Sequence, residues 1–290
     1  MGAADVVPGV SGGTMALILG IYERLLNAIK SFDLIWIRGI VKLDLKTILG
    51  RPDFVFLIPL LAGIFGALLF FTRVVPLPQL ILTHPELIYG LFFGLIVASI
   101  IVLFTEHKVF GVGQFVLLCV GVVTGYFLVT LVPFDTPNST IFIFFAGMIA
   151  ITAMILPGIS GSFILLILHK YSTILGAVAN LDFSILLPFA LGCVTGVALF
   201  SRVLSWLLRH YYYSTLIFIK GILIASLWVI WPFQERVYVV VHEKNRLISS
   251  SPEWPSAMDA TLLASVACMV GGFALVMLIN YLASHRKSTA

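Results

Sequence analysis

A Pro-Gly-x-Ser-Gly segment interrupts an apolar stretch of this chain at two places. The first copy is Pro8–Gly12 and the second is Pro157–Gly161. Proline disfavours helical geometry in the residue before it and glycine permits a sharp turn, so each copy predicts a break in a helix. Inside a bilayer such a break survives only against protein, water or a ligand, because lipid cannot satisfy the backbone. Two matching breaks, one in each half, are typical of a transporter binding site.

The composition is that of a membrane protein. Of the 290 residues, 60% are hydrophobic and 10% are charged, whereas a soluble domain has about 25% charged residues. We predict an all-α polytopic membrane protein, with six spans near 54–72, 86–104, 114–132, 183–201, 214–232 and 257–283. The net charge of +4 comes from basic loops, so it indicates orientation rather than nucleic-acid binding. The three cysteines lie in apolar spans without metal-ligand spacing, and we expect neither a metal nor a cofactor.

The two broken segments are predicted to be re-entrant helical hairpins, over residues 1–30 and 140–178. Each arm has about 15 residues, or about 22 Å as a helix, which is too short to cross a ~30 Å hydrocarbon core. The halves also align with each other. The matches place Pro8, Gly9, Ser11, Gly12, Tyr22, Pro59, Gly63, Phe71 and Arg73 on Pro157, Gly158, Ser160, Gly161, Tyr171, Pro188, Gly192, Phe200 and Arg202.

Each half then contains one hairpin and three spans. Because three crossings is an odd number, the second half is expected to run upside down relative to the first. We predict an inverted-topology repeat in a single membrane domain, with the first repeat over 1–135 and the second over 139–285. The first repeat carries an insertion, 31–50, which is predicted to be an interfacial helix.

Basic residues gather in the loops on one predicted side of the membrane, which should be cytoplasmic. Both termini then lie inside the cell; the first hairpin enters from the cytoplasm and the second from outside. Only Met1–Val7 precedes the first break, whereas a full arm, Ser139–Met154, precedes the second. We therefore expect that the sequence starts late or has lost the first arm of hairpin one.

The residues after each break are candidate ligands for an anion. A helix that starts inside the membrane begins with unpaired N–H groups and a partial positive charge, a combination that binds phosphate. The predicted phosphate-binding residues are Ser11, Gly12, Gly13 and Thr14 in the first copy, and Ser160, Gly161 and Ser162 in the second. The alternative is a packing kink that binds no ligand.

Four basic side chains inside or at the ends of spans are further candidates for the phosphate site. Arg73 and Arg202 are repeat mates, and the planar guanidinium suits bidentate phosphate contacts. Lys170 and Lys220 lie at depths where lysine is costly and often functional. The alternative for all four is a side chain that extends to the lipid headgroups.

Asp5 and Glu23 flank the first break, and Met154 and Ser172 replace them at the second. A carboxylate beside an anion site repels the anion unless it is protonated. We therefore consider Asp5 and Glu23 candidates for coupling transport to protons. The alternative is a carboxylate paired with Arg24 or with a backbone donor.

The run Gly2–Ala16, followed by Gly20–Glu23, closely resembles the signature of a bacterial membrane family. That family, formerly a domain of unknown function, is assigned as polyprenyl-phosphate transporters, and the likeness extends through the second copy, Leu156–Ser162. The resemblance implies a flippase that returns undecaprenyl phosphate, the carrier lipid of cell-wall assembly, across the cytoplasmic (inner) membrane. Its partners would be this substrate and the surrounding membrane lipids, and the chain could also form a homo-oligomer.

Two other functions compete with lipid transport. Polyprenyl-pyrophosphate phosphatases also resemble inverted repeats with re-entrant hairpins, but their motif has arginine after the serine. Here Gly12 follows Ser11, Gly161 follows Ser160, and no Glu-x-x-x-Glu cluster is present to hold a metal. A transporter of small anions could use the same broken helices. We therefore expect a lipid transporter rather than an enzyme.

Overall fold

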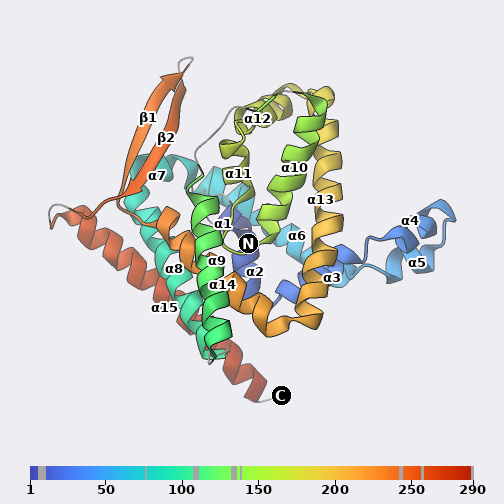
Figure 1. Cartoon of the computed structure of the whole chain (residues 1–290), viewed down its shortest axis with the longest axis horizontal. Helices are drawn as coiled ribbons and strands as arrows, with labels where there is room; N and C mark the ends of the chain where they lie inside the picture. Colours follow the sequence, from blue (N-terminus) through green and yellow to red (C-terminus); the bar gives the residue numbers. More distant parts are fainter. Residues whose placement is uncertain are drawn as a thin grey trace. The chain divides into compact units, whose positions relative to one another are not determined.

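The chain forms helices almost throughout in the computed structural model (Figure 1). The structure describes residues 1–5, 11–75, 77–106, 111–131, 136–137, 139–241, 244–255 and 258–288. These fall into two compact units: the first is Met1–Val75 with Pro133–Leu216, and the second is Pro76–Val132 with Ile217–Ala290. Each unit therefore takes one segment from each of the two predicted repeats.

The first unit contains both broken segments. Its elements from the first half are α1 (Gly2–Asp5), α2 (Gly12–Ile18), α3 (Tyr22–Lys30), α4 (Leu34–Val41), α5 (Leu45–Gly50), α6 (Phe54–Leu69) and the π-helical turn η1 (Phe70–Val74). Its elements from the second half are α10 (Thr140–Ile155), α11 (Gly161–Ile167), α12 (Tyr171–Asn180) and α13 (Phe183–His210). Helix α6 packs on α1 and α3, and α13 packs on α3, α10 and α12.

Helices α10 and α13 lie side by side and run in the same direction (Figure 1). Gly192 approaches Phe144, and four residues later Gly196 approaches Met148, so the register advances together along both helices. Helix α6 and helix α13 also begin alike. Asp53 and Asp182 each accept a hydrogen bond from a backbone N–H of the first turn, which satisfies a donor that the helix itself cannot pair.

The insertion between α3 and α6 forms two short helices, α4 and α5, where the sequence had predicted a single interfacial helix. The chain turns at Lys42–Asp44 between them. Asp33 caps α4 and Asp44 caps α5 through their side-chain oxygens. A second acidic cap inside the insertion explains the division, because such a residue starts a new helix.

The second unit contains α7 (Leu77–Thr83), α8 (Pro85–Glu106), α9 (Val112–Val129), most of α14 (Tyr212–Ile230) and α15 (Ala260–Ser288). Helix α8 packs on α15 where Gly90 meets Ser265 and Gly94 meets Met269. The register advances in the same sense along both helices, so α8 and α15 are parallel.

Helices α9 and α14 pack in the same manner. Gly121 meets Phe218, and Gly125 meets Ile222 and Ala225, so α9 and α14 are also parallel. Glycine at these positions lets the helix backbones approach closely, as is common between helices in membranes.

Among the described residues, five helices are long and apolar enough to span a membrane: Pro85–Thr105, Val112–Val129, Phe183–His210, Tyr212–Ile230 and Ala260–Leu282. Phe54–Leu69 is a shorter apolar helix of 16 residues. The described residues of all six predicted spans are therefore mostly helical, and the prediction of a helical multi-pass membrane protein is confirmed at this level.

A two-stranded antiparallel ribbon between α14 and α15 departs from the all-helical prediction. Strand β1 (Gln234–Val241) pairs with β2 (Lys244–Pro252), with Gln234 opposite Pro252 and Val241 opposite Lys244. The run Val237–Val241 consists of four valines and one tyrosine, and β-branched and aromatic residues favour strands. The ribbon falls between the predicted spans 214–232 and 257–283, where no strand was predicted.

Candidate functional site

The second break is the sharp turn between α10 and α11. Helix α10 ends at Ile155, Gly158 has a φ of +92°, and α11 begins at Gly161. A left-handed φ of this kind favours glycine, because other residues carry a Cβ that clashes there. The chain then returns along α10, since a Cβ on Gly161 would lie 2.7 Å from the backbone oxygen of Ala150. The predicted helix break at this copy is thus present.

The first break joins α1 to α2. Its Pro8 and Gly9 lie outside the described residues, so the structure does not test the turn itself. The described part begins at Ser11, whose hydroxyl oxygen accepts a hydrogen bond of 3.1 Å from the backbone N–H of Gly13. Ser11 is thereby the N-cap of α2, and Thr14 follows in the first turn.

Three side chains, two at the start of α2 and one on α3, hydrogen-bond the backbone of the second break. The Ser11 hydroxyl donates to the Met154 carbonyl oxygen at 3.2 Å, and the Tyr22 hydroxyl donates to the Ile155 carbonyl oxygen at 2.9 Å. Thr14 Oγ1 accepts from the backbone N–H of Gly158 at 2.8 Å. The two motif copies, far apart in sequence, therefore meet within the first unit. We call Ser11, Thr14 and Tyr22, with their three backbone partners, the clasp.

The clasp is buried and closely packed. Ser11, Thr14 and Tyr22 are each at most 2% exposed. A Cβ on Gly13 would lie 2.8 Å from the Ile155 oxygen, so only glycine permits this approach of α2 to the end of α10. The last carbonyls of α10 have no partner within their own helix, and the two hydroxyls supply hydrogen bonds to them. The clasp thus satisfies polar groups that would otherwise be costly inside a bilayer.

The clasp also indicates what the break can bind. The Gly158 N–H points to an oxygen, that of Thr14. A phosphate oxygen could accept from the same amide. The hydroxyls of Ser160 and Ser162 lie 2.8 Å apart on the same turn and hydrogen-bond each other. The structure therefore brings together Ser11, Thr14 and the Gly158 amide, and it places the serine pair two residues further along the turn.

The two lysines lie elsewhere. Lys170 is 1% exposed, and its ammonium donates at 2.7 Å to the carbonyl oxygen of Thr136, whose own hydroxyl donates to Leu168. It lies beyond the far end of α11 from the break. Lys220 belongs to the second unit, where its ammonium lies 4.8 Å from the ring centroid of Phe104. Both lysines are buried in protein, so neither extends to the headgroups in this structure.

The paired arginines are on the surface of the first unit. Arg73 is exposed in η1, and Arg202 is exposed on α13, where it donates at 2.8 Å to the Ala198 carbonyl oxygen. Within the described part of the chain, neither guanidinium hydrogen-bonds a residue of either break. This position agrees equally with an interface anchor and with a cation that meets a headgroup arriving from the lipid.

Of the two candidate carboxylates, the structure describes the side chain of Glu23. The side chain of Asp5 lies outside the described part, whereas Glu23 is exposed in the first turn of α3. Arg24, considered as a partner for either, instead pairs with Asp53 at 2.8 Å. That hydrogen bond lowers the pKa of the Asp53 carboxyl.

Two buried residues of the first unit, Tyr22 at the clasp and Ser201 on α13, were not among the predicted site residues. Tyr22 was noted as a match to Tyr171 but not as a functional residue, yet its hydroxyl is part of the clasp. Ser201 is fully buried on α13, and among the described residues its hydroxyl has no hydrogen-bond partner. Ser201 precedes Arg202 in the sequence just as Thr72 precedes Arg73. This match between the two halves was the sequence signal that could have identified Ser201.

Together, the fold and the clasp define a multi-pass helical membrane protein whose two broken helices meet in one unit. Comparison with known proteins gives the family. The family model described as undecaprenyl phosphate translocase-like matches residues 1–248, and the chain belongs to this family.

Two relatives carry the name polyprenyl-phosphate transporter. The one from Vibrio cholerae serotype O1 is 37% identical over 287 residues, covering 93% of this chain and 92% of the relative. The one from Staphylococcus aureus is 31% identical over 254 residues, covering 80% of this chain and 83% of the relative. No solved structure matches the chain significantly.

Proposed function

We propose that this protein moves undecaprenyl phosphate across the bacterial cytoplasmic membrane and holds the phosphate at the tips of its two broken helices. The observation that carries the proposal is the clasp, which brings polar groups of both breaks into one buried site. Membership of a family described as undecaprenyl phosphate translocase-like supports the substrate, as do the names of the two relatives.

In this proposal the phosphate replaces hydrogen bonds that the clasp makes without it. A phosphate oxygen would take the position of Thr14 Oγ1 at the Gly158 amide, and Ser11 would turn its hydroxyl from Met154 to the ligand. Ser160 and Ser162 would supply further donors, with the backbone amides of Gly12, Gly13 and Gly161. Each amide or hydroxyl donor keeps an oxygen partner in this exchange, while the Met154 carbonyl gives up the Ser11 hydroxyl and Thr14 Oγ1 gives up the Gly158 amide. The polyprenyl tail stays in the lipid.

Arg73 and Arg202 are assigned a role at the point of entry. Both are exposed on the first unit, where an arriving lipid headgroup could meet a guanidinium before it reaches the break. Lys170 and Lys220 could contribute only after their present contacts, with the Thr136 carbonyl and the Phe104 ring, have opened. We propose Asp5 and Glu23 as the groups that couple transport to protons.

We further propose that the two halves are inverted repeats with re-entrant hairpins. The helix directions in the second unit support this idea: α8 is parallel to α15, and α9 is parallel to α14. Consecutive spans run in opposite directions, so α14 would run opposite to its repeat mate α8. With the basic loops inside, both termini would be cytoplasmic.

A leaflet-specific assay in vesicles tests the function. The purified chain is reconstituted with undecaprenyl phosphate, and a membrane-impermeant phosphatase reports how much of the phosphate lies in the outer leaflet over time. We expect the wild-type protein to bring undecaprenyl phosphate from the inner leaflet within reach of the phosphatase. In protein-free vesicles the inner-leaflet lipid should stay protected. Equal accessibility in both preparations would remove the proposal.

A pair of variants connects the assay to the site. Ser160→Ala removes a hydroxyl at the break and should slow flipping, while Thr195→Val removes an exposed hydroxyl that bonds only within its own helix. Equal slowing by both would argue against a site at the break. Release of phosphate from polyprenyl pyrophosphate by the purified chain would favour the phosphatase alternative. Uptake of inorganic phosphate without lipid flipping would favour the small-anion transporter.

A further inference from the structure

The insertion between α3 and α6, Ser31–Asp53, forms a helical pair that is more apolar on its surface than a water-exposed element should be. We call it the α4–α5 arm. Val41 is 79% exposed and Leu43 80% exposed. The other large apolar residues exposed on the arm are Phe32, Leu34, Ile35, Ile37, Ile40, Leu45 and Leu49. So many exposed apolar side chains on one short element point to a protein or membrane interaction site.

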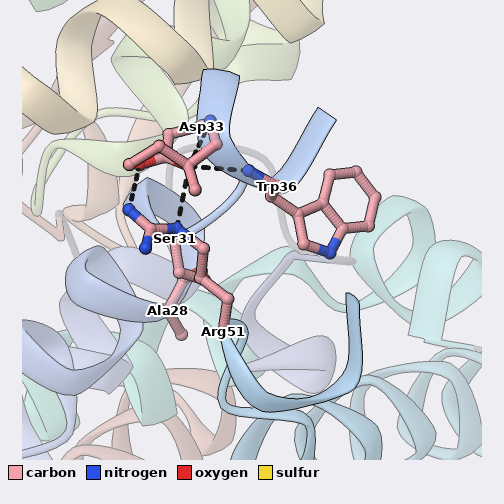
Figure 2. A network of polar contacts seen from close by, with 6 residues as sticks. Ala28, Ser31, Asp33, Trp36 and Arg51 are labelled. Carbon is pink, nitrogen blue, oxygen red and sulfur yellow. Dashed lines mark hydrogen bonds and ion pairs between the residues drawn. The ribbon is translucent and has the colours of Figure 1, made fainter. Parts of the chain in front are cut away.

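The arm is held in shape by its own polar groups (Figure 2). Arg51 donates two hydrogen bonds to the carboxylate of Asp33, from Nε at 2.9 Å and from a terminal nitrogen at 2.5 Å. Asp33 also accepts from the backbone N–H of Trp36, and the Trp36 indole N–H donates to the Ile48 carbonyl oxygen at 3.1 Å. These hydrogen bonds hold α4 and α5 in a fixed arrangement, so the exposed apolar side chains of the arm also keep fixed positions.

The acidic groups of the arm all have partners, with Asp53 paired to Arg24 of α3, whereas three of its basic groups form no ion pair among the described residues. Asp33 pairs with Arg51, and Asp44 accepts from the backbone and hydroxyl of Thr47. The remaining cations are Arg38, Lys42 and Lys46, all exposed. In the part of the chain that the structure describes, no carboxylate lies within ion-pair distance of these three side chains.

We infer that the α4–α5 arm is a monotopic membrane anchor that binds the anionic headgroups of phospholipids. Helix α4 has 8 residues, or about 12 Å, too short to cross a ~30 Å core, so it lies along the interface. Its apolar side chains enter the acyl region while Arg38, Lys42 and Lys46 meet the headgroups.

The charge pattern selects lipid over a second copy of the chain. A self-complementary dimer through this face would place three unpaired cations of one arm opposite the same three of the other. Like charges brought together in this way oppose association. An anionic bilayer surface supplies the compensating charge and covers the apolar residues at the same time. This inference does not depend on the substrate proposed above.

A quenching experiment on the full chain tests the anchor. Val41→Cys carries an environment-sensitive fluorophore, in a background where Cys119, Cys193 and Cys268 are alanine. The protein is reconstituted in phosphatidylcholine nanodiscs that contain increasing fractions of brominated phosphatidylglycerol. We expect blue-shifted emission and quenching at low fractions of the anionic lipid. Brominated phosphatidylcholine should need a much larger fraction, and high salt should remove the difference.

A charge-removing triple variant, R38Q/K42Q/K46Q, is compared with a charge-retaining one, R38K/K42R/K46R. Each cation near an anionic surface raises the affinity for that surface about fivefold. The glutamine variant lacks three cations, so its preference for phosphatidylglycerol over phosphatidylcholine should fall roughly a hundredfold. The charge-retaining variant should keep it, and both should elute as the wild type does on gel filtration.

Three results would overturn the inference: water-exposed emission at Val41→Cys in every lipid, equal quenching by both brominated lipids, or energy transfer between arms of two copies with no lipid preference. An unchanged preference in the glutamine variant would likewise contradict the role of the three cations.

Discussion

Replacement of Thr14 by valine tests the clasp most directly. Valine has nearly the shape of threonine but lacks the oxygen that accepts from the Gly158 N–H at 2.8 Å. Thr14 is 0% exposed, so water cannot take over that hydrogen bond. A buried donor left without a partner costs about 1–3 kcal/mol. We expect Thr14→Val to lower the free energy of unfolding by this amount, measured by circular dichroism as dodecyl sulfate is titrated into mixed micelles.

Two controls separate this hydrogen bond from general effects of substitution. Thr14→Ser keeps the oxygen and loses one methyl group, which costs about 0.8 kcal/mol. Thr195→Val removes an exposed hydroxyl bonded to the Leu191 carbonyl and should change stability by less than about 0.5 kcal/mol. The reasoning is refuted if Thr14→Val is as stable as the wild type, or if Thr14→Ser costs as much as Thr14→Val.

Three further changes have defined outcomes. Tyr22→Phe removes the hydroxyl that bonds the end of α10 and should cost about 1 kcal/mol in the same titration; no loss would mean that another donor replaces it. Gly272→Ala places a Cβ against the backbone of α8 and should cost about 1–3 kcal/mol, whereas Gly271→Ala meets nothing within 4 Å and should not destabilise. The pKa of Asp33 is lowered to about 2 by its hydrogen bond to Arg51, so the ion pair should stabilise the arm at neutral pH and be lost as pH falls from about 4 towards 2. Limited proteolysis of the arm over that range would check this, and Asp33→Asn should remove the dependence.

Much of the local structure could be predicted from sequence patterns. The six apolar stretches are helices, the Pro157–Gly158 turn breaks a helix, and Ser11 caps the helix after the first break. These features depend on residues close together in the chain: a run of apolar side chains, a proline without an N–H, or a hydroxyl within reach of the next turn. The division of the α4–α5 arm was missed because Asp44 was not considered as a second cap.

The sequence by itself determined that this chain spans a membrane and carries two matched breaks, because hydropathy and Pro-Gly chemistry act locally. Only the tertiary structure decided that the breaks meet, with Ser11 bonded to Met154 across 143 residues. It also decided that Lys170 bonds the Thr136 carbonyl rather than a break. Such contacts depend on which helix faces pack together, and the nearly uniform apolar surface of membrane helices carries little information about that choice.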